Sequence, residues 1–245
     1  MNISGSGHIA AGEYNDKISV SGSGKLDGNI RCVALSCSGS VKGEGSIECK
    51  ENITVSGSCH FKMSLAADSV SVSGSVKVGE DIIAKKAVKV SGGLDCGGRI
   101  RCSLLRCSGG ISIGMDAEAD EIRISGRVTC AGLLNAEKID ISIDGTGSSS
   151  RVGAIGGSEI RIHNDRNTRR SPRMPLLSQL VGGDGGTFTV DELIEGDVIA
   201  VECVKAPKVV GRVVAIGAGC DIEFVQYSEE IEIHPDAKVA RYEKI

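Results

Sequence analysis

The chain has 245 residues with a formal net charge of −4, and 40% of its residues are apolar but only 2% are aromatic. The acidic balance argues against nucleic acid as a partner, because phosphate binding needs a basic face. The N-terminus lacks the apolar stretch of a signal peptide, and no run approaches the roughly 18 apolar residues of a membrane-spanning helix. We therefore expect a cytoplasmic protein whose ten cysteines stay reduced.

A Ser-Gly dipeptide recurs at a nearly constant spacing along the chain. Its serines are Ser4, Ser21, Ser38, Ser56, Ser73, Ser91, Ser108 and Ser125, and Ser142 continues the series without the glycine. From the second copy onward, the residue before each serine and the residue two positions earlier are apolar, as in Val20 and Ile18. This regularity indicates one structural unit repeated along the chain.

Within each repeat, apolar and polar residues alternate, and glycines fall at fixed offsets. Alternation with many β-branched residues is typical of strands with one buried face, and the glycines indicate corners. So short a repeat has room for about three strands but not for a crossover helix, which needs roughly 30 residues. We predict an all-β parallel β-helix with rungs of about 17–18 residues, regular over 1–143.

The repeat accounts for the cysteines as small core residues. The inward positions predicted for them are those of Cys32, Cys37, Cys49, Cys96, Cys102, Cys107 and Cys130. Zinc sites usually bring cysteines in CxxC pairs, and the chain has no such pair. We expect no metal site.

Residues 144–187 are rich in Gly, Ser and Arg, which predicts an irregular segment with an exposed loop, apart from one rung-like piece at 159–163. The loop joins basic and apolar residues: Arg166, Arg169, Arg170, Arg173, Met174, Leu176, Leu177 and Leu180. That composition suits contact with a membrane surface or an envelope-associated partner, so the inner face of the cell membrane is a candidate location. A solvated insertion is the simpler alternative. Residues 188–245 regain strand patterning and are predicted to continue the solenoid as less regular rungs.

Catalytic and cofactor motifs are not completed anywhere in the chain. The segment 22–26 lacks the first glycine and the hydroxyl residue of a phosphate loop. The four histidines are far apart, and the Ser-Gly serines are too numerous for a single nucleophile. Acidic pairs such as Asp116 with Glu118, or Asp120 with Glu121, lack the long loops and aromatic platforms of β-helical carbohydrate enzymes. We expect neither an enzyme nor a cofactor.

The two ends of a β-helix expose unpaired strand edges, and most solenoids cap them. The chain begins almost directly with a repeat motif and stays strand-like nearly to its last residue. We predict end-to-end self-assembly through Ile3, Ile18, Val20, Ile231, Ile233 and Val239. A charge at Ile18 or Val20, or at Ile231 or Ile233, should abolish filaments without unfolding the chain, whereas Val72→Asp should unfold it.

The V-x-V-S-G-S repeat, with 194–197 and 216–222 downstream, resembles the bactofilin family of bacterial polymer-forming cytoskeletal proteins, in its longer Firmicutes-type form. The resemblance implies a right-handed β-helix, nucleotide-independent filaments, and roles in cell shape, envelope remodelling or motility. This chain differs in its length, in its arginine loop, and in lacking the disordered, often membrane-targeting N-terminal tail of many members. The arginine loop is then the substitute candidate for membrane contact.

Three alternatives compete with this interpretation. A left-handed β-helix of the acyltransferase type has rungs of similar length, but it repeats aliphatic residues every six positions. A non-polymerising β-helical scaffold would bind partners along its faces instead of at its ends. A β-helical enzyme would need the catalytic features that the sequence lacks.

Overall fold

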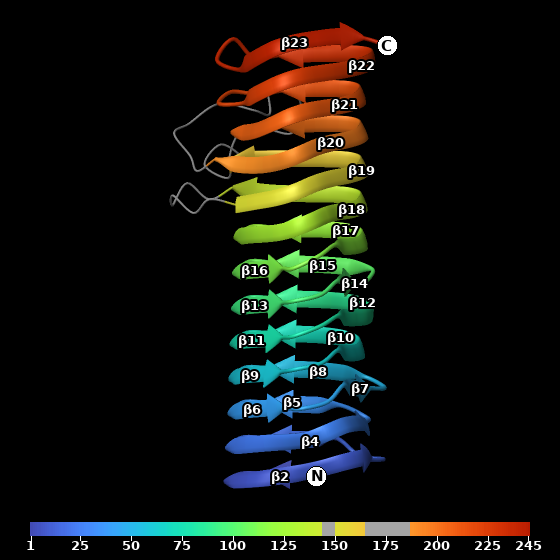
Figure 1. Cartoon of the computed structure of the whole chain (residues 1–245), viewed down its shortest axis with the longest axis vertical. Helices are drawn as coiled ribbons and strands as arrows, with labels where there is room; N and C mark the ends of the chain where they lie inside the picture. Colours follow the sequence, from blue (N-terminus) through green and yellow to red (C-terminus); the bar gives the residue numbers. More distant parts are fainter. Residues whose placement is uncertain (144–149, 165–186) are drawn as a thin grey trace, which may run out of the picture. The chain divides into compact units, whose positions relative to one another are not determined.

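The computed structural model describes residues 1–143, 150–164 and 187–245, and all regular elements there are β-strands. The strands pair in parallel and coil as a β-solenoid within each unit, which confirms the predicted parallel β-helix (Figure 1). The chain divides into two compact units, Met1–Ala119 and Asp120–Ile245. No helix able to cross a membrane is found in these described ranges.

The first unit is built from many short strands. They are β1 (Asn2–Ile3), β2 (Ser6–Glu13), β3 (Ile18–Val20), β4 (Ser23–Cys32), β5 (Leu35–Cys37), β6 (Ser40–Gly43), β7 (Ile47–Cys49), β8 (Asn52–Val55), β9 (Ser58–Phe61), β10 (Leu65–Val72), β11 (Ser75–Val78), β12 (Ile82–Val90), β13 (Gly93–Cys96), β14 (Ile100–Arg101), β15 (Leu104–Cys107), β16 (Gly110–Ile113) and the start of β17 (Ala117–Ile124). Each strand pairs with its equivalent one turn away, so Ile18 faces Leu35 and Leu35 faces Ile53. The length of each turn therefore equals the spacing of the sequence repeat.

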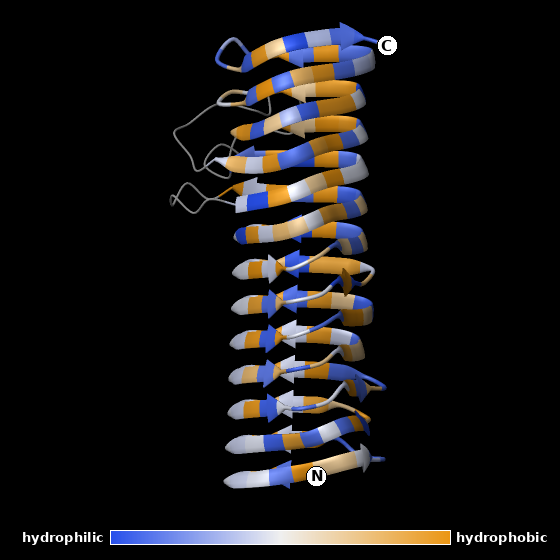
Figure 2. Cartoon of the chain, in the orientation of Figure 1, coloured by the Kyte–Doolittle hydropathy of each residue, from blue (hydrophilic) through white to orange (hydrophobic). Residues whose placement is uncertain are grey.

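Equivalent residues stack into columns that fill the core of the first unit. Val55, Val72 and Val90 form one such column, and none of them is more than 2% exposed. Size is matched within columns: a Cβ built on Gly43 would lie 2.7 Å from the Phe61 ring of the next turn. Figure 2 shows the resulting alternation of apolar and polar residues along the strands. The alternation that is visible in the sequence thus separates core from surface.

The Ser-Gly dipeptides form a corner where successive turns touch through their backbones. A Cβ built on Gly92 would lie 2.0 Å from the carbonyl oxygen of Gly74 in the preceding turn. The preceding serine stays in the ladder, because the Ser91 N–H donates to the Val72 carbonyl at 2.8 Å. Only glycine fits such an approach, which explains why the glycine recurs with the serine from Ser4 to Ser125.

The second unit uses longer strands that run through most of a turn. They are the rest of β17, β18 (Arg127–Ile143), β19 (Ser150–Asn164), β20 (Phe188–Val201), β21 (Val204–Ile216), β22 (Asp221–Ile233) and β23 (Lys238–Lys244). From β18 to β23, each strand pairs in parallel with the next. The predicted rungs after 188 are present as strands.

The segment 144–187 is more regular than its composition suggested. Residues 150–164 form β19, which pairs with β18 on one side and β20 on the other. Its glycines interrupt the alternation of apolar and polar residues that would indicate a strand. Gly157 is needed for packing, because a Cβ there would lie 2.3 Å from the Ala136 carbonyl oxygen. The predicted loop residues from Arg166 to Leu180 lie outside the described residues.

None of the ten cysteines forms a disulfide, and nine of them are buried. The exception is Cys102, which was expected in the core but is half-buried. The period-two pattern places it on the inward side, but it directly follows the two-residue strand β14. The backbone leaves the strand there, so the alternation no longer determines the direction of the side chain.

One carboxyl group is buried in the second unit. Glu202 is 1% exposed and follows the last residue of β20 at a corner, where the first unit carries serine. Its Oε2 accepts a hydrogen bond from the Asn164 backbone N–H at 3.0 Å, while Oε1 has no hydrogen-bond partner among the described residues. Burial raises the pKa of Glu202, and this effect outweighs the Asn164 hydrogen bond and the charge of His234, which both lower it.

The corner geometry predicts opposite effects for two neighbouring glycines. Gly92→Ala places a methyl group against the Gly74 carbonyl and should lower the free energy of unfolding by at least about 2 kcal/mol. Gly93→Ala meets nothing within 4 Å and should be neutral or slightly stabilising. Thermal denaturation followed by circular dichroism compares the two variants. Equal melting temperatures would contradict the proposed backbone contact.

The buried carboxyl predicts a pH dependence of stability. The folded-state pKa of Glu202 lies above its ordinary value of 4.5, so the folded state binds the proton more tightly than the unfolded state. Stability should therefore fall as pH rises from 4.5 through the folded-state pKa. Glu202→Gln should melt higher than the wild type at mildly alkaline pH, and the difference should shrink near pH 4.5. A constant difference between the two melting curves at all pH values would exclude this account.

Candidate assembly surfaces at the first and last turns

The first turn of the first unit has a strand edge without a partner in the described structure. Strand β1 pairs only with β3, and β2 pairs only with β4. The bonds to the next turn come from one edge: Ser19, Ser21 and Ser23 donate their N–H groups to the carbonyls of Met1, Ile3 and Gly5 at 2.8–3.0 Å. The opposite edge of β1 and β2 remains available for pairing.

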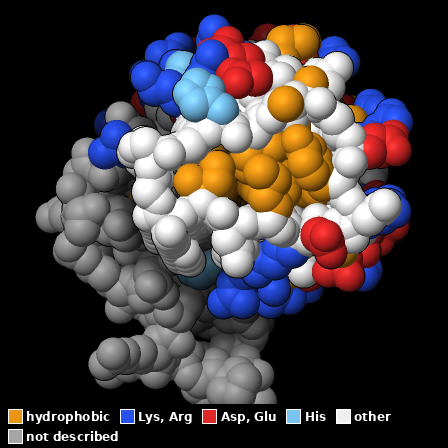
Figure 3. Space-filling view, turned by 90° about the horizontal axis from the view of Figure 1, so that it is seen from below, with side chains coloured by type: hydrophobic (Ala, Val, Ile, Leu, Met, Phe, Trp, Pro, Cys, Tyr) orange, Lys and Arg blue, Asp and Glu red, His pale blue; other side chains and the backbone are white. Residues whose placement is uncertain are grey.

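The surface of this first turn is apolar in its centre. Figure 3 views this end and shows a patch of apolar side chains surrounded by polar and charged groups. Met1 is 50% exposed, Ile3 is half-buried, and Ala10 and Ala11 are exposed. An apolar centre with a polar rim is the usual composition of a protein–protein interface. We call these residues, together with the free edges of β1 and β2, the N-terminal surface.

The last turn of the second unit has a similar combination. Strand β23 pairs only with β22, and its other edge has no partner in the described ranges. Tyr242 is 57% exposed and Ile245 is 65% exposed, while Val239 is half-buried. We call these residues and the free edge of β23 the C-terminal surface.

The second half of β22 adds to the C-terminal surface. Ile231 and Ile233 pair with Val214 and Ile216 of β21 and are half-buried. The ladder between β22 and β23 covers only 221–227 of β22, so it does not extend over these two isoleucines. The sequence-predicted residues of this end therefore lie where apolar surface is left partly open.

Arg241 of β23 contacts an aromatic ring of β22. The Arg241 guanidinium lies 3.9 Å from the centre of the Phe224 ring in the strand beneath, and Lys208 approaches the same ring at 5.7 Å. Phe224 and Arg241 are register partners in β22 and β23. A cation over an aromatic face adds roughly 0.5–1 kcal/mol at an exposed site. This contact holds β23 against β22 although its other edge is open.

Two residues predicted for the assembly surface belong to the core instead. Ile18 is 0% exposed and Val20 is 1% exposed. They lie in the second turn, where Val20 pairs with Ile3 of the first turn. The prediction that a charge at either position spares the fold is therefore wrong, because an unpaired charge would be buried there. Of the predicted residues at this end, Ile3 alone stays partly exposed. Met1, which the repeat pattern does not single out, is 50% exposed beside it.

The side faces of the first unit carry exposed ion pairs. Arg31 donates to Glu13 of the previous turn at 3.0 Å and to Glu48 of the next turn at 2.8 Å. Lys25 and His8 similarly approach Asp27, and this lowers the pKa of the Asp27 carboxyl. Exposed pairs of this kind contribute little stability individually. They do make the sides hydrophilic, unlike the N-terminal surface.

The candidate metal and nucleophile residues are placed as follows. No group of three or more His, Cys, Asp or Glu residues that could hold a metal ion occurs in the parts of the chain that the structure describes. The Ser-Gly serines are exposed at the corner of the turns. The predicted membrane or partner loop, Arg166, Arg169, Arg170, Arg173, Met174, Leu176, Leu177 and Leu180, falls outside these parts.

Comparison with known proteins gives one partial relative. No protein-family profile matches the chain. No solved structure matches it either. The "Uncharacterized protein YhbE" of Bacillus subtilis (strain 168) is 34% identical over 115 residues, which are 47% of this chain and 44% of that protein. The chain is thus similar to less than half of that relative, whose name states no activity.

Proposed function

We propose that this chain is a non-enzymatic structural protein that self-assembles end to end into filaments without a nucleotide. The observation that carries the proposal is the pair of open strand edges, each bordered by exposed apolar residues, at the first and last turns. Cell shape, envelope remodelling and motility are the roles that the likeness to bactofilins suggests.

The open edges supply both the affinity and the geometry of such a contact. An incoming strand that pairs with β23 or with β1 and β2 would continue the parallel or antiparallel ladder, as in β-strand addition. The apolar groups around each edge would lose water at the same time, which favours association in proportion to the area buried. Neither contribution needs nucleotide hydrolysis.

The main competing function is a scaffold that stays monomeric and binds other molecules along its faces. The exposed ion pairs on the sides of the first unit are consistent with either function. What favours assembly is the contrast between those hydrophilic sides and the apolar N-terminal surface.

Electron microscopy of the purified full-length chain tests the proposal. Without nucleotide, the protein should form filaments, and analytical ultracentrifugation should show concentration-dependent growth. A chain that remains a monodisperse monomer at high concentration would refute end-to-end assembly and favour the monomeric scaffold.

Two isoleucines provide a matched test of where the contact lies. Ile3→Asp places a charge on the N-terminal surface and should raise the concentration needed for assembly at least about tenfold, equivalent to roughly 1.4 kcal/mol of contact free energy. Ile83→Asp makes the same change on a side face, where Ile83 is 48% exposed, and should assemble normally. Circular dichroism confirms that both variants fold. Normal assembly of Ile3→Asp, or equal loss in both variants, would show that the first turn is not the contact.

A further inference from the structure

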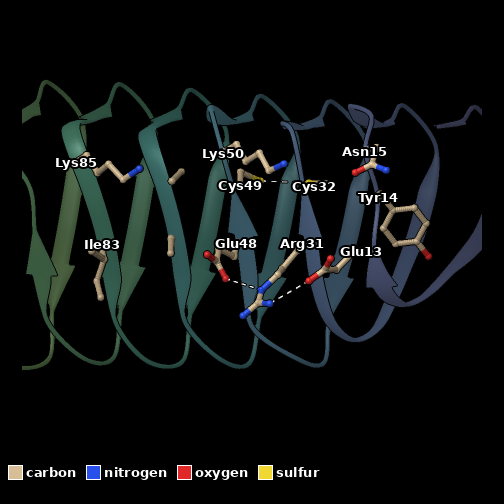
Figure 4. Close-up of a pocket in the computed structure, with 12 residues that line it drawn as sticks. Glu13, Tyr14, Asn15, Arg31, Cys32, Glu48, Cys49, Lys50, Ile83 and Lys85 are labelled. Atoms are coloured by element: carbon tan, nitrogen blue, oxygen red, sulfur yellow. Dashed lines mark hydrogen bonds and ion pairs between the residues drawn. The ribbon is translucent and has the colours of Figure 1, made fainter.

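A groove of about 250 Å³ opens on the side of the first unit (Figure 4). It extends over several successive turns, from Tyr14 in the first turn to Lys85. One wall is the Glu13–Arg31–Glu48 ladder of ion pairs. The other lining residues include the small side chains of Ala66, Ala67, Cys32 and Cys49, which leave the space beside this ladder unfilled.

Two of the small lining residues are cysteines in contact. Cys32 and Cys49 are register partners in β4 and β7, and each is the last residue of its strand. Their Sγ atoms are 3.4 Å apart, and Figure 4 shows this contact between neighbouring turns. The stacking of turns thus brings two thiols together at the edge of an open groove.

We propose that Cys32 and Cys49 are a redox site: a hydroperoxide that enters the groove oxidises the two thiols to a disulfide between adjacent turns. The Cys32 thiolate attacks the peroxide, gains one oxygen as sulfenic acid and releases hydroxide or water. The Cys49 thiol then attacks that sulfur and expels a second water. In total, two thiols and one hydrogen peroxide give one disulfide and two waters.

The backbone geometry accommodates this bond. Neighbouring strands lie about 4.8 Å apart, within the roughly 4.4–6.8 Å between Cα atoms that disulfides span. The sulfur atoms must close from 3.4 Å to about 2.05 Å. Both residues end their strands, and the backbone just beyond them stays bonded, since the Lys50 N–H donates to the Cys32 carbonyl at 3.0 Å. Rotation of the two side chains therefore has to bring the sulfur atoms together. A parallel pair in register is not the ideal frame for a disulfide, which favours a bond that thiols reduce readily.

The protonation of the pair supports its reactivity. A hydrogen bond with Cys49 lowers the pKa of Cys32, and the same contact raises that of Cys49. The thiolate is the attacking species, and we assign that role to Cys32. Cys96 and Cys107 differ in that burial dominates there: it raises the pKa of Cys96 to about 11 and also raises that of Cys107.

A second thiol contact in the same unit provides an internal comparison. Cys37 and Cys59 interact through their side chains and are as deeply buried as Cys32 and Cys49, but neither lines the groove. Their contact raises the pKa of Cys37 and lowers that of Cys59, as in the groove pair, so the two pairs differ in their access to the groove. If access through the groove decides reactivity, the pair Cys32 and Cys49 should oxidise while Cys37 and Cys59 stay reduced.

Peptide mapping of the full-length protein distinguishes the two pairs. The folded chain is treated with hydrogen peroxide, remaining thiols are blocked during denaturation, and trypsin is added. Trypsin yields 32–42 with Cys32 and Cys37, 43–50 with Cys49, and 51–62 with Cys59. We expect a cross-link between 32–42 and 43–50 that dithiothreitol reverses. A cross-link between 32–42 and 51–62, or no cross-link in a folded sample, would overturn the proposal.

A variant separates the two chemical steps. Cys49→Ser removes the resolving thiol, so oxidation should stop at a Cys32 sulfenic acid that a 1,3-diketone probe traps on peptide 32–42. Wild-type protein should trap little probe there, because the disulfide forms instead. Equal labelling of the wild type and Cys49→Ser would contradict a Cys49-dependent second step. These readouts do not depend on filament formation.

Discussion

The structure depends on one constraint: each turn lies on the preceding turn at the spacing of hydrogen-bonded strands. Each residue is therefore next to the residue at the equivalent position of the neighbouring turn. The constraint is tightest at the Ser-Gly corner, where a Cβ on Gly57 would lie 1.9 Å from the Gly39 carbonyl oxygen. No side chain fits between two backbones at that distance, so glycine is required there. With the corner fixed, the residues on both sides alternate between core and solvent in a constant phase.

Stacking of equivalents determines what each column can contain. Inward columns collect apolar groups, because like residues pack well against one another. Outward columns are more varied. Like charges follow one another at Lys25 with Lys42 and at Lys89 with Arg106, where two unit charges about 4.8 Å apart repel by roughly 0.9 kcal/mol in water. The column Glu13, Arg31 and Glu48 instead alternates in sign, which replaces that repulsion by attraction, and the column Ser23, Ser40 and Ser58 is uncharged. The first turn and the last turn each have a neighbouring turn on one side only. Their outer strand edges are therefore unpaired, unlike the strands between them.

Contacts between residues at equivalent positions of the repeat can be predicted from the sequence, whereas the places where the repeat is interrupted cannot. Columns such as Val55, Val72 and Val90 follow directly from the spacing of the Ser-Gly repeat, so the core and the corners were predictable. Of β19, the sequence indicates only the piece 159–163, because the glycines before it carry no apolar signal and the partners of β19 in β18 lie further back along the chain than one regular repeat. Ile18 and Val20 belong to the first turn that follows the repeat pattern closely, but a less regular turn made of β1 and β2 precedes them and covers them. Glu202 occupies a corner where the repeat gives no reason to expect a buried carboxyl group.

The cysteines show how the same residue acquires different chemistry from its place in this stack. Cys107 replaces a valine in a filled column, between sheets that exclude water, and there a thiol is a small apolar group. Cys32 and Cys49 occupy a column beside an open groove, so the stacking that packs valines elsewhere holds two sulfur atoms in contact within reach of small solutes. The residue type is the same for Cys107 and for the pair Cys32 and Cys49, and all three lie at inward positions of the same repeat. The difference arises from the side chains around the column, because small neighbours such as Ala67 leave the groove open where larger ones would close it.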